Sequence, residues 1–153
     1  MPFALVKPVI DFSVRLLCIK VYPGHKRGCP NYGRRESCPP KRNKIHQIIN
    51  LSQPIYAIWN MFDFYKYCLR MRSIHPLWTE PQVRCCLYWQ GGARKQLQLE
   101  IYKFRQDHPN QKILKIPEAT GVNVTATMER LGIKLEWPPE NFTYQVAIAG
   151  KGV

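Results

Sequence analysis

The segment from Cys18 to Lys44 constrains the fold of this chain more than any other part of its sequence. It contains three of the six cysteines, four of the 13 prolines, and eight Lys or Arg residues against the single acid Glu36. Proline removes a backbone hydrogen-bond donor and glycine adds entropy to the unfolded chain, so neither a regular helix nor a central strand suits this segment. We therefore expect a metal ion or an iron–sulfur cluster, bound by cysteines, to hold it.

The size and charge of the chain indicate one basic domain. Its 153 residues fit a single domain over residues 1–153, and 45% hydrophobic with 22% charged residues is typical of a globular protein. The 23 Lys and Arg residues exceed the 10 Asp and Glu residues by 13. This excess indicates a phosphate-bearing ligand or nucleic acid as partner, although a solvated basic surface would give the same count.

The N-terminal region predicts neither export nor membrane insertion. Lys7, Asp11 and Arg15 interrupt its apolar residues before the hydrophobic part of a signal peptide could form. No apolar run approaches the length of a membrane span. We expect a cytoplasmic protein without a membrane partner, in which the cysteines are thiols or metal ligands rather than disulfides.

Expected strands and helices alternate along the chain. Ser13–Val21 reads as a strand, Ile45–Leu51 as a short helix, and Ile55–Phe64 as a central strand that is apolar on both faces. Residues 65–78 read as irregular and basic. The remaining expected elements are a long helix between Thr79 and Pro109, a strand at Lys112–Ile116, a helix at Val122–Leu131, and strands at Ile133–Trp137 and Tyr144–Ala149.

This alternation predicts an α/β fold: a single layered domain with a mostly parallel sheet, one long helix, and an antiparallel pair of strands at the C-terminal edge. At the start of the long helix, Thr79 and Gln82 form a capping box. Gly91 and Gly92 weaken the middle of the helix and indicate a break or a close backbone approach. A stripe at helical spacing is expected to be buried: Ala93, Leu97, Ile101 and Phe104.

Cys29 and Cys38 are the first candidates for metal ligands. Proline follows each of them, which stiffens the turn, and nearby arginines favour the thiolate that binds metal. The alternative is a pair of buried cysteines that pack as small apolar residues. Three further residues could complete the ligand set: Cys18, His25 and Cys86. Three cysteines with one open position predict a four-iron four-sulfur cluster, whereas four closed ligands would indicate zinc.

The run Cys29–Pro40, with the pattern C-P-x-Y-G-x-x-x-x-C-P-P, resembles the signature of a prokaryotic domain-of-unknown-function family described as predicted metal-binding proteins. The stretch Pro117–Val124 resembles the C-terminal segment of that family. The resemblance implies that Cys29 and Cys38 are metal or cluster ligands, and that Glu118 and Gly121 belong to a turn near the site. The chain departs from the family in one respect, because Asn110–Ile116 lacks a second cysteine-rich segment.

Two classes of function remain open from the sequence. The first is an iron–sulfur or metal-binding protein that carries out redox or sulfur chemistry on a phosphate-bearing or nucleotide-like substrate. The second is a basic nucleic-acid-binding module, or a small subunit of a ribonucleoprotein or larger protein complex, with structural zinc or no metal. In both, the side chains expected to contact phosphate or bases are Lys26, Arg27, Tyr32, Arg34, Arg35, Lys41 and Arg42.

Overall fold

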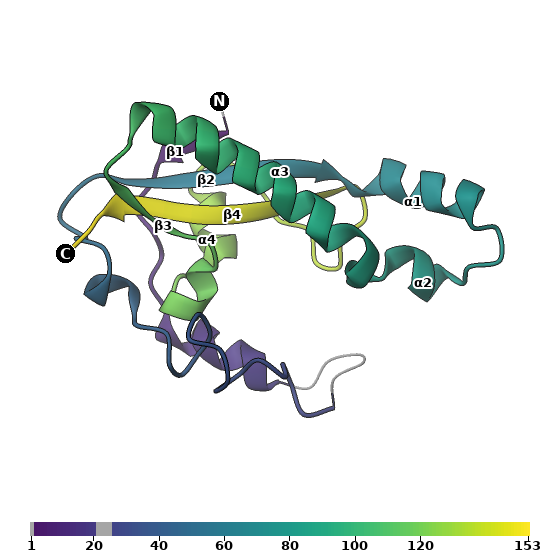
Figure 1. Ribbon diagram of the computed structural model, residues 1–153, viewed down its shortest axis with the longest axis horizontal. Coiled ribbons are helices and arrows are strands. Elements are labelled where there is room, and N and C mark those ends of the chain that lie inside the picture. The colour runs from purple at the N-terminus through teal and green to yellow at the C-terminus, as the bar shows by residue number, and fades with distance from the viewer. Residues whose placement is uncertain (1, 21–25) are drawn as a thin grey trace.

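The computed structural model of the chain describes residues 2–20 and 26–153 and is organised around an antiparallel sheet (Figure 1). The two longest strands, β2 (Ile55–Asp63) and β4 (Phe142–Lys151), pair along the whole length of β2. β1 (Phe3–Leu5) pairs with β2, and β3 (Gln111–Leu114) pairs with β4, which gives the order β1-β2-β4-β3. β2 is therefore a central strand, as its apolar sequence predicts.

The prediction of a mostly parallel sheet is wrong, because all neighbouring strands in the described residues are antiparallel. β2 and β3 do run in the same direction, since both are antiparallel to β4. The helix α3 (Cys86–Asp107) lies between them in the chain and packs across the sheet. β4 then inserts between β2 and β3, which makes this part a split β-α-β unit. The alternation of elements is the same as in a parallel fold, so the sequence pattern could not separate the two.

The predicted antiparallel pair at the C-terminal edge is also wrong. β4 is a central strand, and Ile133–Trp137 is not a strand. Instead, the Glu136 carboxylate accepts hydrogen bonds from the backbone N–H groups of Asn141 and Phe142, both at 2.8 Å. These bonds close a loop that leads into β4. Both edges of β4 pair with β2 and β3 instead of with residues 133–137.

One face of the sheet is covered by α3 (Figure 1). Side chains alternate between the two faces of a strand, so Ile58 of β2 and its cross-strand partner Ala147 of β4 point to the same side. Leu97, Ile101 and Phe104 pack against them, and with Ala93 they are buried, which confirms the predicted stripe.

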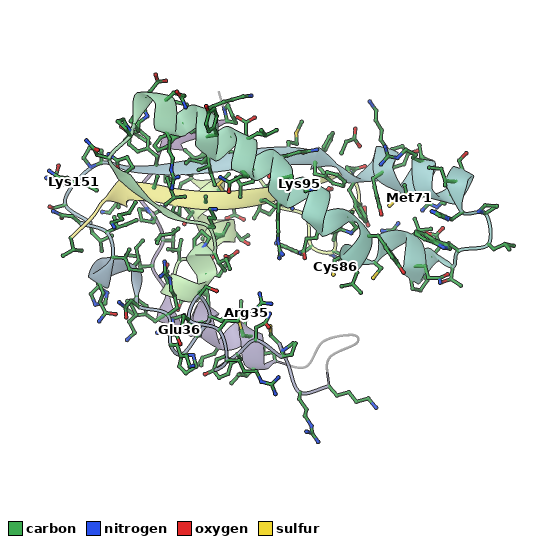
Figure 2. All side chains as sticks on the ribbon, in the orientation of Figure 1. Arg35, Glu36, Met71, Cys86, Lys95 and Lys151 are labelled. Carbon is green, nitrogen blue, oxygen red and sulfur yellow. The ribbon has the colours of Figure 1, made fainter. Side chains whose placement is uncertain are left out.

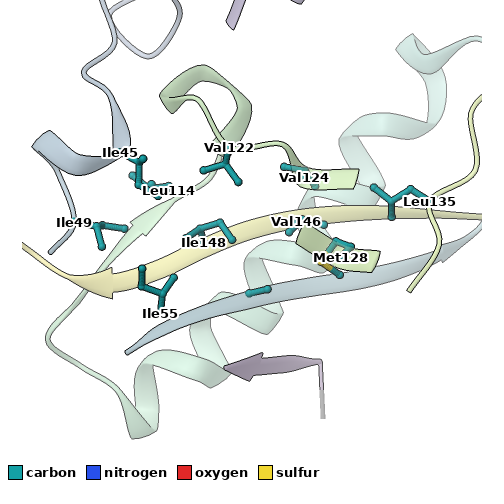
Figure 3. Packing of buried hydrophobic residues seen from close by; sticks show 11 residues of the cluster. Ile45, Ile49, Ile55, Leu114, Val122, Val124, Met128, Leu135, Val146 and Ile148 are labelled. Atoms are coloured by element: carbon teal, nitrogen blue, oxygen red, sulfur yellow. The ribbon is translucent and has the colours of Figure 1, made fainter. Parts of the chain in front are cut away.

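The opposite face is covered by η2 (Ile45–Gln47), η3 (Pro117–Thr120) and α4 (Val124–Glu129), as Figure 3 shows. The buried side chains there are Ile45, Ile49, Ile55, Ala57, Leu114, Val122, Val124, Met128, Leu135, Val146 and Ile148. The helix expected over Ile45–Leu51 is reduced to η2, although Ile45 and Ile49 are buried as its stripe predicts. Together, the two faces form the sheet body.

A helical arm, residues 64–95, begins where β2 ends, and its helices α1 and α2 extend past the end of the sheet (Figure 1). It contains α1 (Phe64–Ile74), α2 (Glu80–Arg84) and the first turns of α3. The prediction of irregular structure over 65–78 is wrong for 65–74, which belong to α1, and Asp63 caps this helix by accepting a hydrogen bond from the backbone N–H of Lys66 at 3.0 Å. Its buried residues Tyr67 and Cys68 pack against Val83 and Trp89.

The capping box of Thr79 and Gln82 is present, but it begins α2 rather than one long helix. The extended backbone of Cys85 separates α2 from α3. The break therefore lies before Gly91 and Gly92, through which α3 continues without interruption. A Cβ added to either glycine would meet no described atom within 4 Å, so no close backbone approach in the described part of the chain requires them.

The cysteine-rich segment forms a third part, on the side of the sheet that carries η3 and α4 (Figure 1). We call its described residues, 12–20 and 26–44, the Cys lobe. The strand predicted at Ser13–Val21 is wrong where the structure describes it, because Phe12–Ile19 forms the 3₁₀ helix η1. Asp11 caps this helix by accepting a hydrogen bond from the Ser13 N–H at 3.0 Å.

Candidate metal centre in the Cys lobe

Cys18 and Cys29 are joined through their backbones. The Cys29 N–H donates a hydrogen bond to the Cys18 carbonyl at 2.6 Å, which brings η1 against the following loop. Gly28 makes this approach possible, since its φ of +79° is left-handed and a Cβ there would lie 2.6 Å from the Cys18 oxygen. Two cysteines that are 11 positions apart in sequence therefore lie beside each other.

Cys38 lies in a tight loop that is closed by backbone hydrogen bonds. The Gly33 N–H donates to the Pro39 carbonyl at 2.7 Å, and the Arg42 N–H donates to the Cys38 carbonyl at 3.0 Å. All three thiols are partly exposed and none forms a disulfide. The prolines and the left-handed Gly33 stiffen this loop, so the position of Cys38 is fixed by backbone geometry rather than by packing.

Two other thiols and one carboxylate affect the pKa of the Cys18 thiol. Partial burial raises the pKa of the Cys18 thiol, and the sulfurs of Cys29 and Cys38 and the carboxylate of Glu118 raise it further. A bound cation would reverse the effect, because it stabilises the thiolate form of every sulfur that it contacts.

The turn that contains Glu118 and Gly121 packs against η1. The Asp11 N–H donates to the Gly121 carbonyl at 2.8 Å, and the Phe12 ring occupies the space that a Cβ on Gly121 would fill. Gly121 has a φ of +97°, so glycine suits both its conformation and this contact. Surrounding protein raises the pKa of the Glu118 carboxyl by desolvation, although part of its side chain still reaches solvent.

Arg15 joins the lobe to the sheet body, a role that could not be predicted from its sequence context. Its Nε donates to the Ala119 carbonyl at 3.0 Å, and its Nη2 donates to the carbonyls of Pro40 and Arg42. The guanidinium thus bridges η1, η3 and the loop after Cys38. Its five fixed donors suit such a bridge, but a single basic residue within an apolar run does not reveal which carbonyls it reaches.

The Cys lobe lacks an apolar core. Gly28 and Pro39 are its only buried members among the described residues. The large apolar side chains of η1 face solvent instead, with Leu16, Leu17 and Ile19 about half exposed. Small units that cannot bury enough apolar surface depend on disulfides or metals for their structure, and thiolates are ligands for zinc and for iron–sulfur clusters. The donor set of the lobe fits such a group.

The other predicted ligands are not brought to this site. His25 lies outside the described residues. Cys86 is exposed at the start of α3, far from Arg35 and Glu36 of the lobe (Figure 2). Cys68 is buried inside the arm, where burial raises its thiol pKa. In residues 2–20 and 26–153, no three side chains of Cys, His, Asp or Glu converge as ligands of one metal ion.

Most of the predicted phosphate-contacting residues are free to meet a ligand from solvent. The side chains of Lys26, Arg27, Arg34 and Arg35 are exposed. Two others are engaged or half-buried, since Lys41 pairs with Glu36 at 3.3 Å and Arg42 is only partly accessible. Tyr32 lines a hollow of about 360 Å³ at the surface of the lobe, together with Phe12, Ser13, Arg15, Leu16, Pro39, Pro40 and Lys44.

Comparisons with known proteins did not identify relatives. A scan against models of protein families found no match, and searches of curated proteins and of solved structures found no similar protein. The family resemblance inferred from Cys29–Pro40 therefore stays a prediction. None of the helices in the described parts of the chain combines the length and the apolar character that crossing a membrane requires.

Proposed function

We propose that the Cys lobe binds an iron–sulfur cluster through Cys18, Cys29 and Cys38. The observation that supports this most strongly is the presence of three partly exposed thiols in one lobe without an apolar core, with Cys29 joined to Cys18 by a backbone hydrogen bond. A cluster would supply the cross-links that the lobe otherwise lacks. Because each cysteine of a four-iron cluster binds a different iron, the ligands need not converge on one point, as they would around zinc.

Three ligands leave one position of a four-iron cluster for a substrate or for a further protein ligand. When bound, such a cluster can transfer electrons or hold a substrate at the iron that lacks a cysteine. Glu118 is the nearest acidic group that we identify, and it would contribute a carboxylate beside the open position. Four-iron four-sulfur is the cluster type that we favour, with zinc as the alternative.

The substrate class that we propose is a phosphate-bearing or nucleotide-like molecule. In the hollow of the lobe, the rings of Phe12 and Tyr32 would face a planar group. The Lys44 ammonium lies 4.7 Å from the centre of the Phe12 ring and would contact a phosphate. The exposed cations of the lobe would raise the local concentration of such an anion.

Anaerobic reconstitution with iron and sulfide tests the proposal. We expect the wild-type chain to turn brown and to bind about four iron and four sulfide ions, as this cluster type requires. Cys18→Ser, Cys29→Ser and Cys38→Ser should each lose most of the bound iron. Cys86→Ser is the matched control, because it removes an exposed thiol on the arm and should retain the full iron content.

Two outcomes would count against this assignment. Equal iron content in Cys38→Ser and wild type would remove Cys38 from the ligand set. Zinc as the only metal bound after purification and after reconstitution would favour a structural site. Circular dichroism of each variant shows whether the sheet body is still folded, so that lost iron is not confused with lost fold.

The second candidate function is binding of nucleic acid by the same basic lobe. The exposed positions of Lys26, Arg27, Arg34 and Arg35 favour it, since flexible cations suit a phosphate backbone. Affinity for a fluorescent RNA oligonucleotide should then fall steeply with salt in wild type and less steeply in Arg34→Ala/Arg35→Ala. If the Cys→Ser variants bind RNA as tightly as wild type, nucleic-acid binding does not need the metal centre.

A further inference from the structure

The arm exposes large apolar side chains that none of the described residues covers. Leu77 is 94% exposed and Leu87 is 85% exposed, the two highest values among the large apolar side chains of the described residues. Leu77 lies in the connection between α1 and α2, and Leu87 lies in the first turn of α3. Scattered exposed leucines are common, but two such side chains on one projecting element indicate an interaction surface.

Stacked aromatic rings hold this surface rigid. The His75 ring stacks on Trp78 with centroids 3.9 Å apart, and Trp78 stacks on Tyr88 with centroids 4.9 Å apart. Trp78 directly follows Leu77, and Tyr88 directly follows Leu87, so the stack joins the two exposed leucines. A rigid apolar surface loses little conformational entropy on binding, which favours recognition of a partner.

Gly91 and Gly92 extend the surface along α3. Gly91 lies four residues after Leu87, and Gly92 lies four residues after Tyr88, which places each glycine on the same side of the helix as the residue it follows. Glycine destabilises an exposed helix relative to alanine, and no contact with a described residue requires it here. The space beside the two glycines is where another backbone could approach α3 closely.

The positive charge of the arm indicates that its partner carries negative charge. Residues 64–95 contain six Lys and Arg residues against Glu80 alone, a net charge of +5. Arg72 and Arg84 pair with Glu80, whereas Arg70 and Lys95 have no ion pair with any described residue. A second copy of the chain would bring like charges together. Nucleic acid would neutralise them but would leave the two leucines without an apolar contact.

We propose that Leu77, Leu87, Tyr88, Gly91 and Gly92 form a docking face for a protein partner with an apolar groove bordered by carboxylates. The leucines would enter the groove, Arg70 and Lys95 would meet the carboxylates at its edge, and the glycines would admit the partner's backbone. This surface lies on the arm and does not depend on the metal centre. The proposals of a docking face and of a metal centre can therefore be tested independently.

Photo-crosslinking in the cells that produce the protein tests the docking face. p-Benzoylphenylalanine is placed at position 87, and at Leu5 as the control, because Leu5 is also an exposed leucine but lies on the edge strand β1. We expect position 87 to crosslink one acidic protein that position 5 does not capture. Purified, that protein should bind the full chain, and Leu77→Asp/Leu87→Asp should weaken the affinity about tenfold or more.

Gly91→Ala/Gly92→Ala separates docking from a structural role. Alanine favours the helix, so the melting temperature of the isolated chain should rise while the crosslink yield from position 87 falls. A rise in melting temperature with an unchanged yield would overturn the role of the glycines. Crosslinks to RNA or to a second copy, equal yields from positions 87 and 5, or no crosslink at all would overturn the docking face itself.

Discussion

The sheet body and the Cys lobe are stabilised in different ways. The body buries large apolar side chains on both faces of β2 and β4, and Ile58, Phe104 and Ile148 are fully inaccessible to solvent. The lobe buries only Gly28 and Pro39 among its described residues and exposes its leucines. Hydrophobic burial scales with apolar area, so it accounts for the body but not for the lobe. The comparison separates a scaffold that folds around its own core from a lobe for which we propose an added group.

The largest expected effect is on the body. Phe104→Ala removes a fully buried ring that packs edge-on against Phe3, with centroids 5.2 Å apart, and should lower the free energy of unfolding by about 3–5 kcal/mol. Chemical denaturation followed by circular dichroism measures it. Leu16→Ala in the lobe is the control and should cost less than about 1 kcal/mol, because Leu16 is 50% exposed. Equal losses would contradict the comparison.

Gly28→Ala should disturb the lobe and spare the body. The new Cβ would approach the Cys18 carbonyl and would require a strained left-handed backbone, at a local cost of about 1–3 kcal/mol. We expect iron content to fall while the unfolding transition of the body stays within about 1 kcal/mol of wild type. Gly132→Ala is the matched control, since Gly132 has a similar φ of +77° but no atom near the added Cβ. It should leave iron content unchanged.

A smaller effect is expected at the loop before β4. Hydrogen bonds from the Phe142 and Asn141 backbones lower the pKa of Glu136, so the ionised carboxylate stabilises the folded chain. This stabilisation is complete above the ordinary glutamate pKa of 4.5 and is lost as the pH falls through the lower folded-state value. Glu136→Gln should therefore lower the melting temperature at pH 7 by a few degrees and have less effect at low pH. A difference that is independent of pH would contradict this account.

The parts of the fold that follow from local patterns could be predicted, and the parts that depend on distant pairing could not. The α3 stripe and the capping box of Thr79 and Gln82 are set by spacing within one helix, so the sequence shows them directly. The insertion of β4 between β2 and β3 depends on residues that are far apart in sequence. α1 was missed because its basic residues hide a short buried face, although Asp63 three residues before Lys66 is the pattern of a helix cap.

The residues of the candidate site also divide into those that local sequence patterns predict and those that depend on distant contacts. Cys29 and Cys38 can be recognised by the prolines that follow them, but only the backbone hydrogen bond between Cys29 and Cys18 shows that Cys18 lies beside Cys29. Sequence spacing did not show whether Cys18 or Cys86 is the better candidate ligand. The structure favours Cys18, because Cys86 lies on the arm. Arg15 binds backbone carbonyls, and every residue has one, so the sequence does not show which residues it contacts.

Hydrogen exchange of the lobe with and without metal tests the central claim most directly. The amides to follow are those of Cys29, Gly33 and Arg42, which donate to carbonyls of the lobe, with Ile148 of β4 as the internal reference. In the iron-loaded chain the three lobe amides should exchange slowly, and removal of iron by a chelator should make them exchange fast while Ile148 stays protected. Equal protection of the lobe before and after iron removal would contradict the claim that a metal centre holds it.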